Sequence, residues 1–298
     1  MYWRWRGYCY CCGKSKLNIN NISVIGSGTM GNGIAHVSAL SGYKVCLVDS
    51  EQKALDKAID TIDNNMTRQI TKGIVSKDEV ENAKNNIITS INIEKSSQSD
   101  LIIEAIPEDL SLKKKLFKQL DSIIKETAIL ATNTSSISIS DLAKATSRPD
   151  NVIGMHFMNP VPVMRLVEVI TSEFTSEQTL GTVNQVAKKM GKIAVSCNDY
   201  PGFVSNRILM PMINEAIICY DQGVASIEAI DKIMVLGMSH PMGPLKLADL
   251  IGLDVCLNIM NVLHEGFQDD KYRPSKMLLE MVSRGVLGKK TGKGFYKY

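Results

Sequence analysis

A glycine-rich segment between residues 26 and 33 constrains the fold more than any other part of this chain. Its glycines have the spacing Gly-x-Gly-x-x-Gly-x-Gly, after the apolar run INNISVI and before the helix-like run GIAHVSAL. In such a strand–turn–helix unit, Gly26 allows a tight turn, Gly28 lets the backbone approach a bound group, and Gly31 lets helix and strand pack closely. Phosphate groups would lie at the helix N-terminus, where backbone N–H groups are unpaired. The segment therefore predicts a β-α-β unit built around an anionic ligand.

An acidic residue at the end of the next apolar run indicates that this ligand is a dinucleotide. Asp49 ends the run YKVCLVD and stands 23 positions after Gly26. A carboxylate there accepts hydrogen bonds from ribose hydroxyls and repels a 2′-phosphate, so we expect NAD rather than NADP as the cofactor. Lys53, the first basic residue after Asp49, leaves some room for NADP. The alternative is a glycine-rich turn with Asp49 as a helix N-cap.

The order of apolar runs along the 298 residues predicts two domains. Up to about residue 200, short apolar runs alternate with helix-like stretches, which is typical of a doubly wound parallel sheet. Beyond that point, apolar residues recur at helical spacing. We expect an α/β, Rossmann-type NAD-binding domain over residues 17–200 and an all-α C-terminal domain over residues 201–298, preceded by an extension, residues 1–16.

Composition excludes several classes of protein. Hydrophobic residues make up 44% of the chain and charged residues 22%, which is an ordinary globular mixture rather than a disordered one. No apolar run reaches the roughly 18 residues that a membrane helix needs, so no membrane is expected as a partner. The net charge is only +3, and the basic excess lies near the N-terminus, so no nucleic acid is expected either.

Cysteine usage indicates a soluble protein of a reducing compartment, either the cytoplasm or the mitochondrial matrix. Four of the seven cysteines stand alone within apolar stretches: Cys46, Cys197, Cys219 and Cys256. Cys9 and Cys12 form a lone Cys-x-x-Cys pair without the further ligands that zinc needs, so no metal site is expected. The basic, acid-free residues 1–16 are either a disordered extension or a targeting segment.

Among the four histidines, His156 has the surroundings of a catalytic base. It stands near the end of an apolar run, VIGMHF, on the side where doubly wound sheets bind their ligands. Glu168 follows twelve residues later within the apolar run RLVEVI, where a carboxylate needs a partner. As a pair, Glu168 would fix the imidazole tautomer of His156 while the other ring nitrogen takes a proton. The alternative is a structural histidine and an edge-strand glutamate.

Several long blocks resemble one enzyme family. The segments LIIEAIPEDLSLKKKLF, ATNTSSISI, GMHFMNPVPVMRLVEVI, DYPGFVSNRIL, HPMGPLKLADLIGLD and GKKTGKGFYKY are similar to those of the L-3-hydroxyacyl-CoA dehydrogenases, nearest to the short-chain 3-hydroxybutyryl-CoA dehydrogenases. The resemblance runs from Leu17 to the last residue. It implies that His156 is the catalytic base and Glu168 its partner. It also implies that Ser135 bonds the substrate oxygen and that Asn206 holds the substrate.

The same resemblance implies residues for the cofactor and the substrate. Glu108 and Lys113 match family positions near the nicotinamide ribose of NAD. Lys72 falls where the family has a lysine near the CoA moiety, and Asn65 falls where relatives often have a small polar residue. The helical stretch from Asn65 to Val80 is the least family-like part. A homodimer joined through the helical domains, which also bind substrate, is implied as well.

The function implied by this resemblance is NAD-dependent oxidoreduction between (S)-3-hydroxyacyl-CoA and 3-oxoacyl-CoA, by hydride transfer and without a metal. The expected substrates are short, 3-hydroxybutyryl-CoA or acetoacetyl-CoA, in fatty-acid breakdown (β-oxidation) or butyrate metabolism. Two alternatives stay open. One is a related dehydrogenase for a sugar acid of the gulonate type, and the other is a non-catalytic, crystallin-like NAD-binding protein.

Overall fold

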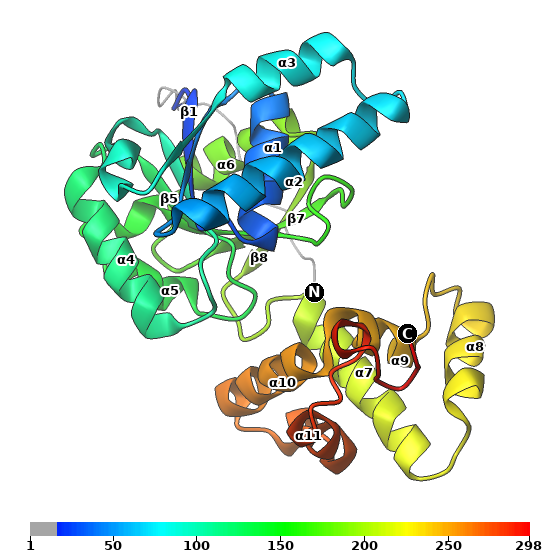
Figure 1. Cartoon of the computed structure of the whole chain (residues 1–298). Coiled ribbons are helices and arrows are strands. Elements are labelled where there is room, and N and C mark those ends of the chain that lie inside the picture. Colours follow the sequence, from blue (N-terminus) through cyan, green and yellow to red (C-terminus); the bar gives the residue numbers. More distant parts are fainter. Residues whose placement is uncertain (1–16) are drawn as a thin grey trace, which may run out of the picture.

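The computed structural model describes residues 17–298, which form a larger lobe with a sheet and a smaller helical lobe (Figure 1). The expected N-terminal extension, with its Cys9–Cys12 pair, lies outside the described residues. Within residues 17–298 no single helix is long and apolar enough to cross a membrane. The consecutive helices α9 (Pro244–Ile251) and α10 (Leu253–Phe267) have the length and apolar composition of a membrane span only when they are taken together. The chain bends by 98° between them.

One eight-stranded sheet organises the larger lobe, in the order β3-β2-β1-β4-β5-β6-β7-β8. Its strands are β1 (Asn21–Ile25), β2 (Lys44–Val48), β3 (Ile87–Ser90), β4 (Leu101–Glu104), β5 (Ile129–Thr132), β6 (Val152–Phe157), β7 (Leu166–Thr171) and β8 (Ile193–Asn198). Neighbouring strands of this sheet are parallel except β6 and β7, which are antiparallel. The expected doubly wound, Rossmann-type sheet is confirmed, with one antiparallel pair that the alternation of runs did not predict.

Helices cover both faces of the sheet (Figure 1). One face packs against α1 (Thr29–Leu40), α2 (Gln52–Thr71), α3 (Lys77–Asn85) and α6 (Glu177–Lys189), and the other against α4 (Leu110–Ile123), α5 (Ile139–Ala143) and the 3-10 helix η1 (Ile93–Gln98). Side chains of β4 alternate between the two cores, with Leu101 and Ile103 in the first and Ile102 in the second. Burial on both faces explains why the strands are almost continuously apolar.

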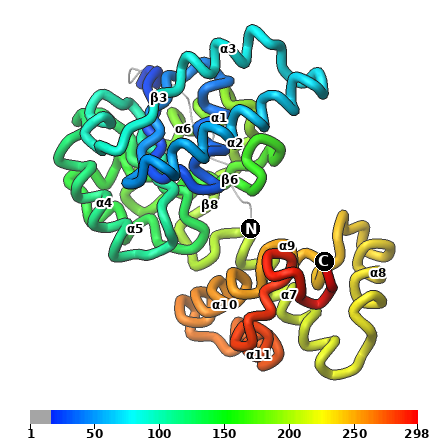
Figure 2. The backbone as a smooth tube through the Cα atoms, viewed as in Figure 1, coloured from blue at the N-terminus to red at the C-terminus, as the bar shows by residue number. Residues whose placement is uncertain are grey.

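The helical lobe follows β8 and appears as the yellow-to-red part of the tube in Figure 2. Besides α9 and α10 it contains α7 (Ser205–Asp221), α8 (Ile227–Gly237) and α11 (Lys276–Ser283). Apolar residues from these helices form a third core, which confirms the expected all-α C-terminal part. The buried carboxylate of Asp249 on α9 accepts hydrogen bonds from the N–H groups of Phe295 and Tyr296, at 2.9 and 2.8 Å, and so anchors the C-terminal tail.

Three short 3-10 helices complete the described elements. They are η2 (Pro149–Asn151), η3 (Asp270–Tyr272) and η4 (Lys289–Thr291). The four cysteines of the described chain are free thiols, of which Cys46 and Cys256 are buried. Burial raises the pKa of the Cys256 thiol to about 12 and that of Cys197 to about 11. These thiols therefore behave as small apolar side chains.

Candidate active site

The glycine-rich turn links β1 to α1 as its spacing predicts. Gly26 has a φ of +98°, in the left-handed region that favours glycine, and its N–H donates to the carbonyl of Val48 at 2.7 Å. A Cβ on Gly31 would lie 1.7 Å from the carbonyl oxygen of Gly26, so α1 packs on the turn only because Gly31 lacks a side chain. At Gly28 nothing lies within 4 Å of the Cβ position, which leaves that backbone open to a ligand.

Asp49 lies beside this turn, directly after β2. Ser27 donates two hydrogen bonds to its Oδ2, from the N–H and from the hydroxyl, both at 2.7 Å. Burial opposes ionisation of this carboxyl, but the hydrogen bonds from Ser27 and Glu51 outweigh it and hold the pKa of Asp49 below its ordinary value. The other oxygen, Oδ1, accepts a longer bond of 3.3 Å from the N–H of Glu51. An ionised, oriented carboxylate therefore stands next to the glycine turn.

A cavity of about 1140 Å³ opens over the glycine turn and Asp49. Apolar side chains that follow β3 and β4, or come from α4, form much of its wall, among them Ile93, Ile106 and Leu116. Apolar walls suit a base, the carboxylate suits a ribose, and the helix N-terminus suits phosphates. The residues present therefore fit NAD.

His156 and Glu168 stand directly opposite each other in the antiparallel pair β6–β7. Their side chains share one face of the sheet, and Nδ1 of His156 lies 2.8 Å from Oε2 of Glu168. Both residues are buried. Burial opposes ionisation of Glu168, but hydrogen bonds from His156 and Ser205 outweigh it and lower the pKa of this carboxyl. The carboxylate places the proton of a neutral imidazole on Nδ1 and leaves Nε2 as an acceptor.

Ser205, which the sequence pattern did not indicate, also holds Glu168. Its N–H donates to Oε1 at 3.0 Å and its hydroxyl donates to Oε2 at 2.7 Å. Ser205 is the first residue of α7, so the helical lobe contributes to a site on the sheet. The ring of Phe203, just before it, packs against His156 with a centroid distance of 5.9 Å. The only signal in the sequence was a serine at the start of an apolar helix pattern.

Ser135 and Asn206 lie on the Nε2 side of the imidazole, opposite the nitrogen that contacts Glu168. The hydroxyl oxygen of Ser135, after β5, is 3.1 Å from Nε2 of His156. Asn206, on α7, donates from Nδ2 to the carbonyl of Ser135 at 2.9 Å. The loop after β5, the strands β6 and β7, and the helix α7 thus bring together the four residues that the resemblance implied for catalysis. An oxygen atom bound near both Nε2 and the Ser135 hydroxyl would lie within reach of a proton acceptor and a donor.

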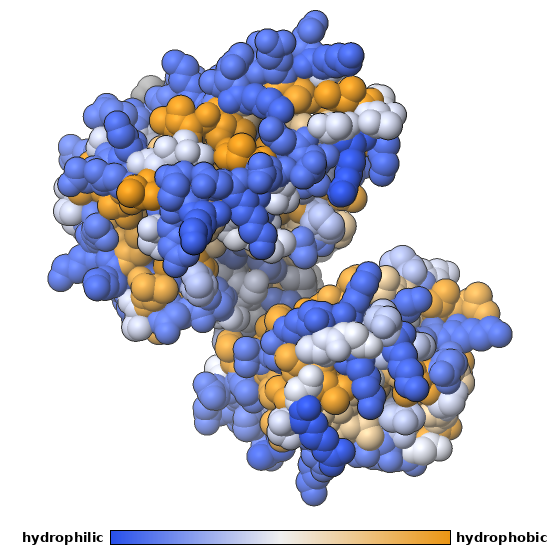
Figure 3. Space-filling view, in the orientation of Figure 1, coloured by the Kyte–Doolittle hydropathy of each residue, from blue (hydrophilic) through white to orange (hydrophobic). Residues whose placement is uncertain are grey.

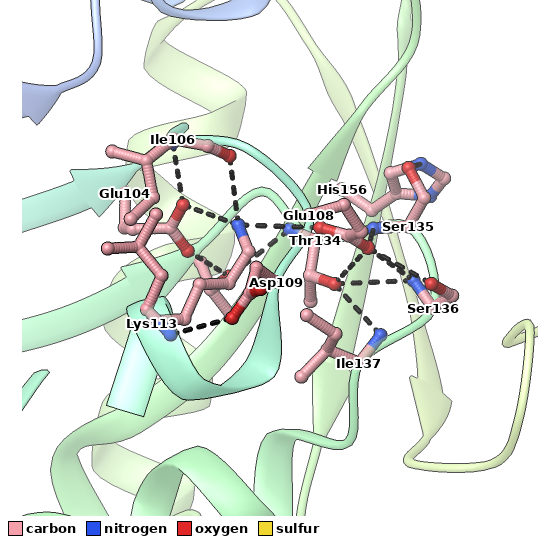
Figure 4. A network of polar contacts seen from close by, with 12 residues as sticks. Glu104, Ile106, Glu108, Asp109, Lys113, Thr134, Ser135, Ser136, Ile137 and His156 are labelled. Carbon is pink, nitrogen blue, oxygen red and sulfur yellow. Dashed lines mark hydrogen bonds and ion pairs between the residues drawn. The ribbon is translucent and has the colours of Figure 1, made fainter. Parts of the chain in front are cut away.

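Glu108 and Lys113 lie next to Ser135, as Figure 4 shows. Glu108 is partly exposed and accepts hydrogen bonds from the loop 134–136. Lys113 has an exposed fraction of only 1% and forms an ion pair with Glu104 at 2.5 Å. Neither side chain lines the large cavity. The side chain of Lys113 is therefore much less accessible to a bound ligand than that of Glu108.

Of the two further residues implied for substrate binding, Asn65 lies on α2 and Lys72 directly follows its last residue. Asn65 lines a second cavity, of about 430 Å³, between the glycine turn, α2 and residues 159–162. Lys72 is exposed and caps the C-terminal end of the same helix. Residues seven positions apart lie on roughly the same side of a helix, so both side chains project from one side of α2.

The other three histidines have different surroundings. His36 is buried in α1 with Nε2 2.9 Å from Oε1 of Gln69, and burial lowers its pKa. His264 contacts Asp270 at 3.3 Å on the helical lobe. His240 lies in the loop before α9. None of these contacts involves His156.

Comparison with known proteins finds relatives over nearly the whole described chain. Residues 21–200 match the model for the 3-hydroxyacyl-CoA dehydrogenase NAD binding domain, and residues 202–298 match the model for the C-terminal domain of that family. The chain is 54% identical over 275 residues to a "Probable 3-hydroxybutyryl-CoA dehydrogenase" of Deinococcus radiodurans, covering 92% of this chain and 99% of that one. It is 43% identical over 290 residues to the human protein "Hydroxyacyl-coenzyme A dehydrogenase, mitochondrial", and the match covers 95% of this chain and 92% of the human protein.

A solved structure has the same fold. The (S)-3-hydroxybutyryl-CoA dehydrogenase of Ralstonia eutropha superposes with a TM-score of 0.92 at 47% sequence identity, covering 94% of this chain and 99% of that one.

Proposed function

Because this chain belongs to the 3-hydroxyacyl-CoA dehydrogenase family, whose N-terminal domain binds NAD, we propose that it interconverts (S)-3-hydroxyacyl-CoA and 3-oxoacyl-CoA. The observation that carries the proposal is the position of His156, with Nδ1 held by Glu168 at 2.8 Å and Nε2 3.1 Å from the Ser135 hydroxyl. We propose short substrates, 3-hydroxybutyryl-CoA and acetoacetyl-CoA, since two of the relatives are named for the former. The reaction would serve fatty-acid or butyrate metabolism.

His156 acts as the general base in the oxidation direction. Its Nε2 takes the proton from the 3-hydroxyl group of the substrate. Bound NAD supplies the hydride acceptor. Glu168, ionised and held by Ser205, stabilises the imidazolium that forms. In the reduction direction the imidazolium returns this proton to the oxygen on C3.

Ser135 and Asn206 orient the substrate for this transfer. The Ser135 hydroxyl lies beside Nε2, so it hydrogen-bonds the same substrate oxygen. Asn206 is bonded to the backbone of Ser135 and belongs to the other lobe, so it fixes the substrate between the two lobes. Holding the reacting groups in the correct relative orientation lowers the entropic part of the activation barrier for the reaction.

The cofactor is assigned to the cavity over the glycine turn, with Asp49 on the adenosine ribose. The ionised carboxylate favours NAD over NADP because it repels a 2′-phosphate. Glu108 is assigned to the nicotinamide side, since it adjoins Ser135. For the CoA moiety we propose Asn65 and Lys72, which project from one side of α2, with Lys72 able to meet a phosphate.

We also propose a homodimer joined through the helical lobe. Figure 3 shows apolar patches on the surface of this lobe. Large apolar side chains exposed there include Ile208, Ile233, Leu236, Met238 and Leu250. Contiguous exposed apolar surface marks a contact site more often than free surface. Sedimentation equilibrium at micromolar concentration tests this, and a monomer contradicts it.

Domain boundaries and location complete the proposal. We place the boundary near residue 200, between β8 and α7, and assign substrate binding and dimer contacts to the helical domain. We propose the cytoplasm or the mitochondrial matrix as the location, the latter because one relative is named as mitochondrial.

Reduction of acetoacetyl-CoA, followed by NADH absorbance, tests the function. NADH and NADPH are compared in parallel on the wild type and on His156→Ala. We expect turnover with NADH and a fall in kcat on the order of 10²- to 10⁴-fold in the variant, the usual contribution of a general base. Absence of wild-type turnover with either cofactor, despite tight NADH binding, favours the sugar-acid dehydrogenase or the non-catalytic NAD-binding protein. Near-normal turnover of the variant contradicts the assignment of His156.

A further inference from the structure

Lys192 is a buried lysine that the proposed mechanism does not use. It directly precedes β8, and its exposed fraction is only 8%. Its Nζ donates to two backbone carbonyls, that of Val161 at 2.5 Å and that of Met164 at 2.8 Å, and among residues 17–298 no carboxylate pairs with it. Burying an ammonium group without a carboxylate costs free energy, and burial lowers the pKa of Lys192. An apolar side chain would avoid this cost, so the contacts point to a role for the two carbonyls that the lysine holds.

Both carbonyls belong to the loop between β6 and β7, residues 158–165. The loop contains a tight turn, in which two N–H groups donate to the carbonyl of Pro160 at 3.0 and 2.9 Å. Val161 also packs against α1, where a Cβ on Gly33 would lie only 2.8 Å from the Cβ of Val161. The loop is therefore fixed both by the ammonium group of Lys192 and by its contact with α1.

This loop forms one wall of the second cavity, whose volume is about 430 Å³. Residues 159–162 line the cavity on one side, and the glycine turn and α2, with Asn65, line the rest. Lys192 is not among the lining residues, so it supports the wall from behind. The position of the loop therefore sets the width of the cavity.

The wall formed by α2 has a support of its own. Nε2 of His36, which is buried on α1, lies 2.9 Å from Oε1 of Gln69 on α2, one turn after Asn65. This contact ties α2 to α1. The described hydrogen bonds of the Lys192 side chain all go to the loop, so a change at Lys192 moves one wall while the contact between α1 and α2 remains.

We propose that Lys192 is a positioning residue for the binding of acyl-CoA. It holds the loop 158–165, and the loop sets the width of the cavity that receives part of the CoA moiety. The inference rests on the proposed function, which places the CoA moiety beside Asn65. Lys192 acts through the loop, since its ammonium group is buried and engaged with backbone carbonyls.

The variant Lys192→Met tests this, because it keeps a long side chain and removes the charge together with both hydrogen bonds. With NADH saturating, we expect KM for acetoacetyl-CoA to rise on the order of tenfold and kcat to change less than about twofold, since binding energy common to substrate and transition state is lost. The dissociation constant of CoA alone, measured by titration calorimetry, should rise by a similar factor. A fall in kcat at unchanged KM would overturn the inference, and so would an unchanged affinity for CoA.

A truncated substrate separates positioning from general loosening of the fold. Acetoacetyl-N-acetylcysteamine carries the reacting groups but lacks the phosphates and the nucleotide of CoA. If Lys192 acts on the cavity for CoA, Lys192→Met and the wild type have similar kcat/KM with this substrate. Equal losses with both substrates overturn the inference. Val161→Ala, which keeps both carbonyls and loosens the contact with Gly33, gives the same comparison with a smaller effect if Lys192→Met does not fold.

A matched control lies four residues earlier in the chain. Lys188, in the last turn of α6, is exposed, and Lys188→Met is expected to leave KM and the affinity for CoA unchanged. The readouts also separate this inference from the proposed function. Absence of wild-type turnover and of CoA binding counts against the function, whereas equal CoA affinity of the wild type and Lys192→Met counts against the positioning role alone.

Discussion

Glu168 and Ser205 are joined by two hydrogen bonds although they lie 37 positions apart and on different lobes. Glu168 in turn holds Nδ1 of His156, so the orientation of the imidazole depends on the first residue of α7. An anion at that point is favoured by the unpaired N–H groups of a helix N-terminus. The contact between the lobes is therefore part of the site itself.

Substitution Ser205→Ala is expected to lower kcat on the order of tenfold. The hydroxyl bond to Oε2 is lost, while the N–H bond to Oε1 remains, so Glu168 is held less firmly and stabilises the imidazolium less well. A hydrogen bond to a charged group is worth about 1.5–3 kcal/mol, and about 1.4 kcal/mol corresponds to tenfold in rate. Steady-state kinetics with acetoacetyl-CoA and NADH measure the change.

Ser283→Ala provides the control for this substitution. Ser283 is exposed at the end of α11, where its hydroxyl bonds only to the carbonyl of Glu280 among the described contacts. Its loss should leave kcat unchanged. Equal kcat for Ser205→Ala and the wild type would show that the hydroxyl bond has no part in orienting the base.

The stability of the fold is expected to depend on the ionisation of Glu168. Its folded-state pKa lies below the ordinary value of 4.5, so ionisation stabilises the fold above that pH and the contribution is lost as pH falls through the folded pKa. Glu168→Gln should therefore cost about 2 kcal/mol at neutral pH. The difference in Tm between variant and wild type should shrink as pH falls below 4.5. Thermal unfolding at several pH values tests this, and a constant difference contradicts it.

Most of the fold could be predicted from the sequence, but the antiparallel direction of β7 relative to β6 was not predicted. The runs VIGMHF and RLVEVI are apolar, and hydrophobicity does not encode strand direction. The length of the connection between the two strands indicates the antiparallel direction. The residues between Phe157 and Leu166 are too few for the crossover that parallel strands require. With that reversal, His156 and Glu168 become register partners, which explains why they meet twelve positions apart.

The residues of the site that were not predicted from the sequence are those that act through contacts between distant parts of the chain. Ser205 and Glu104 act on residues from other elements, and no local pattern marks such a partner. The spacing of the glycines and the position of Asp49, by contrast, are local features of one β-α-β unit, and they were predictable.

Cofactor preference is expected to depend on the charge of Asp49. Asp49→Asn should lower kcat/KM for NADH on the order of 10- to 100-fold, because hydrogen bonds to a carboxylate are replaced by weaker ones. NADPH should lose less, since the charge that repels its 2′-phosphate is removed. Kinetics with both cofactors measure the ratio. Glu51→Gln, an exposed acid two residues along the chain, is the control and should leave the ratio unchanged.

Two glycines in helices are expected to respond to alanine in opposite directions. A Cβ on Gly31 would lie 1.7 Å from the backbone oxygen of Gly26, so Gly31→Ala must separate α1 from the turn and should cost about 3 kcal/mol or more. Gly181, inside α6, has nothing within 4 Å of its Cβ position. Gly181→Ala should stabilise the fold by about 0.5–1 kcal/mol, because alanine loses less entropy in a helix. Urea unfolding measures both, and similar stabilities for the two variants would contradict the close packing of α1 on the glycine turn.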